Sequence, residues 1–91
     1  MDPERLKDRF FAVLSSILEI DARSLPLDAS PDTVESWDSL KNMYIIQNLE
    51  EAFGIVFTDV EIFELASLSD LLGAVGRKMG GHHFSDSAVA P

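Results

Sequence analysis

The chain has 91 residues, no cysteine, 46% apolar residues and a formal net charge of −9. A chain of this length forms one domain, and its apolar content is sufficient for a single core. The absence of cysteine excludes disulfides, thiolate metal sites and cysteine nucleophiles. The acidic balance disfavours nucleic acids and anionic membranes as partners, and it favours a basic protein surface.

The sequence contains no apolar run long enough to span a membrane, and its N-terminus lacks a secretory signal pattern. We therefore expect a cytoplasmic protein without membrane insertion. The charge is concentrated in the middle of the chain, because Lys41 is the single base between residues 24 and 76, against ten acids. These acids flank the candidate site described below.

The first predicted helix covers residues 3–19. Asp2 is a suitable N-cap residue, and Pro3 suits the first helical position. Apolar residues follow at helical spacing, at Leu6, Phe10, Val13, Leu14, Ile17 and Leu18. Phe10 and Phe11 are adjacent and cannot both face one core well, so we expect one of them to cover the loop that follows.

A long loop is predicted over residues 20–37, because prolines and small polar residues interrupt any helical pattern. Four apolar residues should attach it to the core: Ile20, Leu25, Leu27 and Val34. The loop acids resemble the start of a calcium-binding EF-hand. However, Thr33 stands where the sharp turn needs glycine, and Ser39 stands where the bidentate glutamate is required. We therefore expect no calcium site.

The second predicted helix covers residues 38–53, with an apolar stripe at Leu40, Met43, Ile46, Leu49 and Phe53. Asp38 is a preferred N-cap residue, and Ser39 falls in the first turn, where backbone amides lack intrahelical partners. A helix N-terminus carries partial positive charge and favours a phosphate. No base close in sequence activates Ser39 as a nucleophile, so its hydroxyl is a candidate for modification by another enzyme.

Gly54 should end this helix in the left-handed conformation, and residues 55–57 should form an extended link. Thr58 and Glu61 match a capping box for a short helix over residues 59–64. The inner face of this short helix is predicted to contain Ile62, Phe63 and Leu65.

The last predicted helix covers residues 68–79 and ends at the Gly80-Gly81 pair. We expect a disordered tail over residues 81–91, which are small and polar. The His82-His83 pair lies in this tail without a third ligand, so we expect no metal site. The whole pattern predicts an all-α fold: an antiparallel four-helix bundle with three main helices, one short helix and a long first loop.

The second predicted helix begins with the triplet Asp38-Ser39-Leu40 and ends with a run of leucine, paired acids and phenylalanine between Leu49 and Ile55. This segment resembles the acyl carrier protein family, including the carrier domains of polyketide and peptide synthetases. In that family an Asp-Ser-Leu triplet opens the second helix, and its serine carries 4'-phosphopantetheine. The resemblance covers about residues 4–78 and implies an acyl carrier domain over residues 1–80.

The resemblance implies that a phosphopantetheinyl transferase attaches 4'-phosphopantetheine from coenzyme A to Ser39, with Asp38 and Leu40 flanking the site. The chain would then be a phosphoprotein and a carrier, not an enzyme. An acyl-loading ligase or acyltransferase would attach the cargo as a thioester, and a ketosynthase or another biosynthetic enzyme would receive it. Neither a Gly-rich phosphate loop nor a Gly-x-Ser-x-Gly elbow is present in the sequence.

Partner recognition is expected on the outer face of the second helix and at its entry. The candidates besides Asp38 and Leu40 are Trp37, Lys41, Tyr44, Gln47 and Glu51. Candidates for sheltering the acyl chain are Met43, Ile46 and Ile62, with plain core packing as an equal alternative for Met43.

The predicted face differs from that of housekeeping fatty-acid carriers, which are often strongly acidic there. Lys41, Tyr44 and Gln47 depart from that pattern. The resemblance therefore favours a dedicated pathway of fatty acid, polyketide or other specialised lipid or secondary-metabolite biosynthesis over bulk fatty acid synthesis.

Two alternatives remain open from the sequence. The cargo could be an aminoacyl or peptidyl group, as in peptidyl carriers. The chain could instead be an unmodified acidic helical adaptor that binds a basic partner through the same face and does not need Ser39. We expect a monomer, because the second helix must remain accessible to partners.

Overall fold

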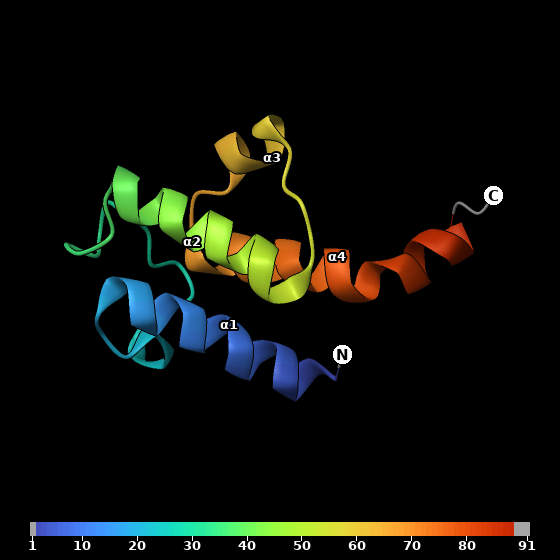
Figure 1. Cartoon of the computed structure of the whole chain (residues 1–91), viewed down its shortest axis with the longest axis horizontal. Helices are drawn as coiled ribbons and strands as arrows, with labels where there is room; N and C mark the ends of the chain where they lie inside the picture. Colours follow the sequence, from blue (N-terminus) through green and yellow to red (C-terminus); the bar gives the residue numbers. More distant parts are fainter. Residues whose placement is uncertain (1, 89–91) are drawn as a thin grey trace.

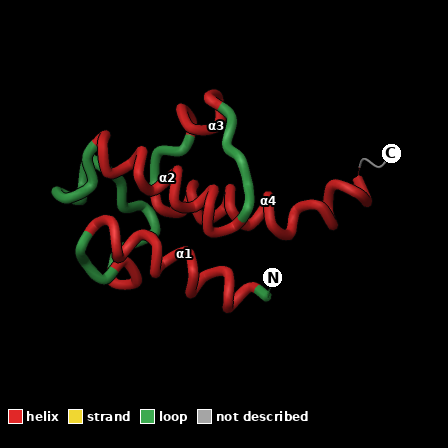
Figure 2. Tube along the Cα trace, viewed as in Figure 1, coloured by secondary structure: helices red, strands yellow, loops and turns green. Residues whose placement is uncertain are grey.

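The computed structural model describes residues 2–88, and these residues form helices and loops without a strand (Figures 1 and 2). The all-α class is therefore confirmed. The elements are α1 (Pro3–Leu18), a 3-10 turn η1 (Ala22–Ser24), α2 (Ser39–Phe53), α3 (Asp59–Glu64) and α4 (Leu68–Ala88). No helix of the described part combines the length and hydropathy that crossing a membrane requires.

The three main helices do not all alternate in direction. Figure 1 shows that α1 runs opposite to both α2 and α4, which run in the same direction. The segment between α2 and α4, which contains α3, returns the chain part of the way toward the end of the bundle where α2 began. The predicted antiparallel arrangement therefore holds between α1 and its two neighbours, and α2 and α4 are parallel.

The core is formed by one face of each main helix together with a few loop residues. Its largest fully buried side chains come from α1, α2, α4 and the loop: Phe10, Leu14, Leu18, Trp37, Ile45, Leu49, Leu68, Leu71 and Val75. The buried stripe of α2 differs from the predicted one. Ile46, Leu49 and Phe53 are buried as expected, and Ile45 joins them, whereas Leu40 and Met43 are exposed.

Helix α1 starts and ends close to its predicted limits. The Asp2 carboxylate accepts a hydrogen bond from the Glu4 amide at 3.0 Å, and Glu19 ends the helix in the left-handed conformation. Phe10 is buried, and Phe11 meets it edge-on with ring centroids 5.3 Å apart. The Arg23 guanidinium lies 5.0 Å from the centre of the Phe11 ring, so Phe11 covers the loop as expected.

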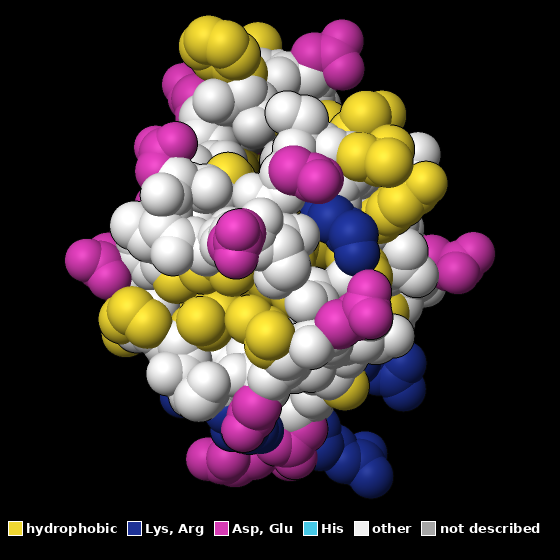
Figure 3. Space-filling model, turned by 90° about the vertical axis from the view of Figure 1, so that its left-hand side faces the viewer, with side chains coloured by type: hydrophobic (Ala, Val, Ile, Leu, Met, Phe, Trp, Pro, Cys, Tyr) yellow, Lys and Arg dark blue, Asp and Glu magenta, His cyan; other side chains and the backbone are white. Residues whose placement is uncertain are grey.

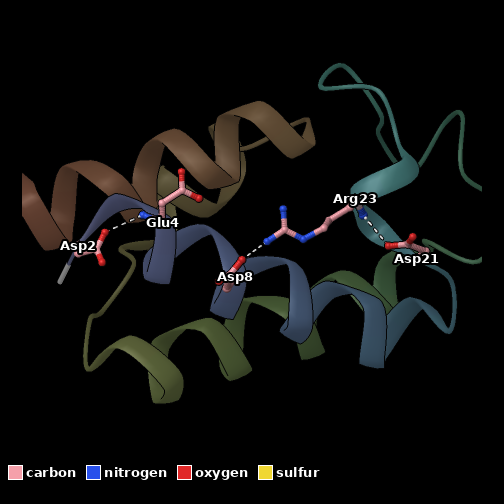
Figure 4. Close-up of polar contacts among 5 residues, drawn as sticks. All are labelled: Asp2, Glu4, Asp8, Asp21 and Arg23. Carbon is pink, nitrogen blue, oxygen red and sulfur yellow. Dashed lines mark hydrogen bonds and ion pairs between the residues drawn. The ribbon is translucent and has the colours of Figure 1, made fainter.

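The loop before α2 is held mainly by backbone contacts and a few apolar side chains. Arg23 of η1 also pairs with Asp8 on α1 (Figure 4). Leu25 and Val34 pack against the core as predicted. Leu27 and Ile20 do not, because both side chains are exposed; it is the Leu27 carbonyl that anchors the loop, by accepting a hydrogen bond from the Ser69 amide at 2.9 Å.

The short helix α3 is attached to the bundle on one side. Thr58 and Glu61 form the predicted capping box, and Ile62 packs against the core together with Leu65, the residue that follows α3. Phe63 was expected on the inner face, but its side chain is 91% exposed. Six residues do not complete two helical turns, so α3 has room for one inward stripe, and Phe63 lies outside it.

Helix α4 continues beyond its predicted end. It passes through Gly80 and Gly81 and reaches Ala88, extending past the ends of the other helices (Figure 1). The prediction that the helix ends near residue 79 is wrong, because glycine costs only about 1 kcal/mol relative to alanine and keeps its hydrogen-bonding amide. Residues 89–91 and the side chains of residues 80–88, including His82 and His83, lie outside the described part. The division into a domain and a tail stays a prediction.

Two glycines provide an internal test of this fold. Gly54 ends α2 with a φ of +65°, whereas Gly76 lies within α4, and a Cβ at either position would meet no atom within 4 Å. We expect Gly54→Ala to lower the free energy of unfolding by about 1–2 kcal/mol, because alanine is strained in the left-handed region. We expect Gly76→Ala to raise it by about 0.5–1 kcal/mol. Urea unfolding followed by circular dichroism measures both changes in the free energy of unfolding. A change in the same direction in both variants would contradict the assigned conformations.

A second prediction concerns the pH dependence of the attachment of α3. Lys78 Nζ lies 2.8 Å from Glu61 Oε2, and the hydrogen bond from Lys78, then that from the Thr58 amide, lowers the pKa of Glu61. A lowered pKa in the folded state means that this contribution is complete above the unfolded-state pKa and is lost as the pH falls through the folded-state value. The stability difference between wild type and Glu61→Gln should therefore shrink as the pH falls.

Urea unfolding of both proteins across the acid range measures that difference. The Glu64→Gln variant removes one negative charge from the same helix at an exposed position and serves as the control. A wild-type advantage over Glu61→Gln that grows with acidification would contradict the proposed sign.

Candidate functional site

Ser39 is the first residue of α2, and its side chain is exposed. The preceding Asp38 is the N-cap in an extended conformation, and its Oδ1 accepts a hydrogen bond from the Lys41 amide at 2.8 Å. The Asp38 carbonyl accepts a second bond from the Asn42 amide at 2.9 Å. The Asp38 carboxylate is thus engaged as a helix cap. The result is an accessible hydroxyl at the positive end of a 15-residue helix.

Trp37 lies directly before the cap and is only 2% exposed. Its indole Nε1–H donates to the side-chain Oδ1 of Asn42 at 2.9 Å, and its amide donates to the Val34 carbonyl at 2.9 Å. The expectation that Trp37 contacts partners is therefore wrong. The large indole gains more from burial in the core, and its single polar atom finds an acceptor there.

The outer face of α2 consists of Leu40, Met43, Tyr44, Gln47 and Glu51, all of which are exposed. Leu40 is 55% exposed and Met43 is 57% exposed, so this face is largely apolar beside Ser39. Tyr44, Gln47 and Glu51 lie on the outer face as predicted, and Leu40 lies there as a recognition candidate although the predicted apolar stripe included it. Figure 3 views the end of the molecule to which α1 leads and from which α2 starts, and it shows groups of apolar side chains with acidic ones around them and a basic side chain beside one group.

Lys41 belongs less clearly to this face. Its Nζ donates to the Ile17 carbonyl at 3.1 Å and lies 3.5 Å from Glu19 Oε2. Its ammonium group therefore ties the start of α2 to the end of α1. The single base of the central segment serves the fold, and the outer face of α2 contains no other cation.

The three predicted shelter residues differ in exposure, and their role as a shelter stays a prediction. Ile46 belongs to the core, Ile62 is partly buried against it, and Met43 is exposed. Met43 therefore packs neither in the core nor in a closed shelter. An open groove of about 700 Å³ lies along α1, and Asn48 of α2 also lines it. Its lining residues are Arg5, Asp8, Arg9, Ala12, Val13, Ser16, Ile17 and Asn48.

Sequence reasoning missed two polar residues that hold this region in place. Asn42 lies on the buried stripe of α2, one turn before Ile45 and Ile46, and receives the indole N–H of Trp37. Glu50 accepts a hydrogen bond from the Phe57 amide at 2.8 Å and so fixes the link that follows α2. A polar residue at a core-facing helical position was the available signal for Asn42, because such a residue needs a buried partner.

Comparison with known proteins adds an independent line of evidence. The family model of the phosphopantetheine attachment site matches residues 8–75, a segment that contains α2 and Ser39. A comparison with curated proteins found no match to this chain. The family match covers well over half of the sequence and agrees with the helical order and the capped, accessible start of α2. The protein therefore belongs to the family of phosphopantetheine-binding carriers that includes the acyl carrier proteins, and its covalent cofactor is 4'-phosphopantetheine.

Proposed function

We propose that Ser39 is the residue that bears 4'-phosphopantetheine and that the chain delivers acyl groups to biosynthetic enzymes. The observation that carries this proposal is the exposed Ser39 at the first position of α2, inside the segment matched by the family model. The adjacent cap places the serine beside the positive end of the helix. A phosphodiester at this position gains from that partial charge.

The residues around Ser39 fit a bulky covalent group. Leu40 and Met43 are exposed, so they leave the space outside the first turn accessible to a partner enzyme. The Asp38 side chain accepts a hydrogen bond from the Lys41 amide, so its carboxylate is engaged at the helix start. Lys41 points to the end of α1 and does not compete for the hydroxyl.

The attachment step needs a base that the transferase supplies, because the Asp38 carboxylate is engaged as a cap. The Ser39 oxygen forms a bond to the β-phosphorus of coenzyme A, the pyrophosphate P–O bond breaks, and adenosine 3',5'-bisphosphate leaves. The hydroxyl proton passes to the base of the transferase. When bound, the cofactor supplies the terminal thiol that this cysteine-free chain lacks and on which cargo is carried as a thioester.

The partners follow from this role. A phosphopantetheinyl transferase modifies Ser39, an acyl-loading ligase or acyltransferase loads the cargo, and a ketosynthase or another biosynthetic enzyme receives it. The outer face of α2 supports service to a dedicated pathway, because Leu40, Met43 and Tyr44 make it apolar where housekeeping carriers are often acidic. We place this activity in the cytoplasm and assign it to a monomer, whose α2 face is free for successive partners.

The first prediction of this proposal is a change in mass. Incubation with coenzyme A, magnesium and a broad-specificity phosphopantetheinyl transferase should add one phosphopantetheine to the wild-type chain. Ser39→Ala should gain no mass, because the accepting oxygen is lost. Ser36→Ala removes a hydroxyl just before the same helix and serves as the matched control, so it should be modified like wild type. Intact-mass spectrometry with peptide mapping measures all three.

A shift that persists in Ser39→Ala would overturn the assignment of this serine. A folded wild-type chain that gains no mass with several transferases would instead favour the unmodified acidic adaptor. In that case binding to a basic partner should be unaffected by Ser39→Ala.

The second prediction concerns cargo and pathway. Expression of this chain should fail to restore growth to cells that lack their housekeeping carrier, because the α2 face presents apolar contacts in place of acids. In vitro, acyl-activating ligases should load the modified chain, and amino-acid adenylating enzymes should not. Restored bulk fatty acid synthesis would contradict the dedicated pathway, and efficient loading with an amino acid would identify a peptidyl carrier.

A further inference from the structure

The side chains of Trp37 and Asn42 form a hydrogen bond that spans the residue proposed for modification. Trp37 Nε1 donates to Asn42 Oδ1 at 2.9 Å, with Asp38, Ser39, Leu40 and Lys41 between the two partners in sequence. We call this pair the entry clamp. It connects the last residue of the long loop to the first turn of α2. Its geometry therefore affects the direction in which the chain passes from the loop into α2 at Ser39.

Backbone hydrogen bonds hold each partner of the clamp within its own element. The Trp37 amide donates to the Val34 carbonyl, and the Asn42 amide donates to the Asp38 carbonyl, both at 2.9 Å. Each partner of the clamp is therefore fixed in its own element, Trp37 in the final loop turn and Asn42 in α2. The side-chain bond links the two elements across Ser39.

Stability alone does not account for a polar pair at this place. An apolar residue at position 42 would continue the buried stripe formed by Ile45, Ile46 and Leu49. The Trp37–Asn42 bond is part-buried, and replacing both partners of a hydrogen bond shielded from water with apolar groups of similar shape can be nearly neutral in free energy. Such a replacement loses the fixed orientation of the two side chains, because a hydrogen bond restricts the angle between its partners and apolar contact does not.

We propose that Trp37 and Asn42 are positioning residues for the modification of Ser39. The clamp holds the first turn of α2 in one orientation, so that the Ser39 hydroxyl is presented to the transferase in a reactive geometry. This inference rests on the proposed function. Without the clamp, the helix end samples several orientations, and the rate falls with the fraction of molecules in the competent one.

The expected kinetic signature separates positioning from partner binding. The outer face of α2 is not part of the clamp and remains available to the transferase. Loss of the clamp should therefore lower kcat of phosphopantetheine transfer about tenfold and leave the KM for the carrier nearly unchanged. Loss of a contact residue on that face would instead raise KM.

The experiment compares four variants with wild type in the full chain. Asn42→Leu removes the acceptor at similar size, Trp37→Phe removes the N–H, the double variant removes both, and Asn42→Asp keeps an acceptor oxygen at the same place. Ser15→Ala is the matched control, because Ser15 Oγ accepts a part-buried hydrogen bond from the Ala22 amide at 2.9 Å on the α1 side of the same loop. Circular dichroism shows whether each variant is folded at the assay temperature.

Asn42→Leu and Trp37→Phe should each lose about tenfold in kcat, and the double variant should lose no more, because both act on one bond. Asn42→Asp and Ser15→Ala should transfer at the wild-type rate. Trp37 is the only tryptophan, so its emission also reports the clamp and should change in Asn42→Leu but not in Ser15→Ala.

Several results would overturn the inference. Wild-type kcat in folded Asn42→Leu would show that the bond does not position Ser39. A loss in Ser15→Ala as large as that in Asn42→Leu would assign the effect to stability. Should Trp37→Phe fail to fold, Asn42→Leu and its rescue by Asn42→Asp decide the matter. A wild-type chain that gains no mass would instead overturn the proposed function, and the positioning role with it.

Discussion

The burial of Trp37 is the constraint on which the site depends. The long loop between α1 and α2 contributes few buried side chains, and Trp37 is by far the largest of them. Removing a buried tryptophan typically costs about 3–5 kcal/mol, which is a large fraction of the stability of a small domain. Because Asp38 follows immediately, burial of the indole determines where the cap stands, and the cap determines that Ser39 is the first residue of α2.

The loop lies at the start of both α2 and α4. The backbone amides at these two helix starts differ in the acceptors they have. At α4 the carbonyls of Ala29 and Leu27 accept hydrogen bonds from the amides of Leu68 and Ser69, and Ser67 Oγ accepts from the amide of Asp70. These backbone amides at the start of α4 therefore have hydrogen-bond acceptors within the fold. At α2 the acceptors from Asp38 reach the amides of Lys41 and Asn42, which lie beyond the first two positions. Of the two helix ends that the loop supports, α2 is therefore the one arranged to favour an anion.

The features that the sequence predicted correctly are those decided by neighbours in the chain. The caps at Asp38 and Gly54 and the capping box of α3 each depend on residues within one or two turns. Burial of Trp37 and exposure of Phe63 depend on which surfaces meet in three dimensions. Helix α2 shows the difficulty most clearly, because it has apolar residues on two faces. Periodicity alone could not decide whether Leu40 or Ile45 faces the core, since both begin a helical stripe.

The second apolar face of α2 has a consequence for partner choice. Leu40, Met43 and Tyr44 remain exposed in a chain with a net charge of −9, and exposed apolar surface of this kind marks interaction sites. Negative charge acts over a long range and would speed the encounter with a partner whose surface is basic, with a strong dependence on salt. Contacts of the apolar face act only once the surfaces meet. Since Lys41 is bonded to the end of α1, no cation interrupts that face, and the fit of the partner to Leu40, Met43 and Tyr44 would determine which enzyme accepts the carrier.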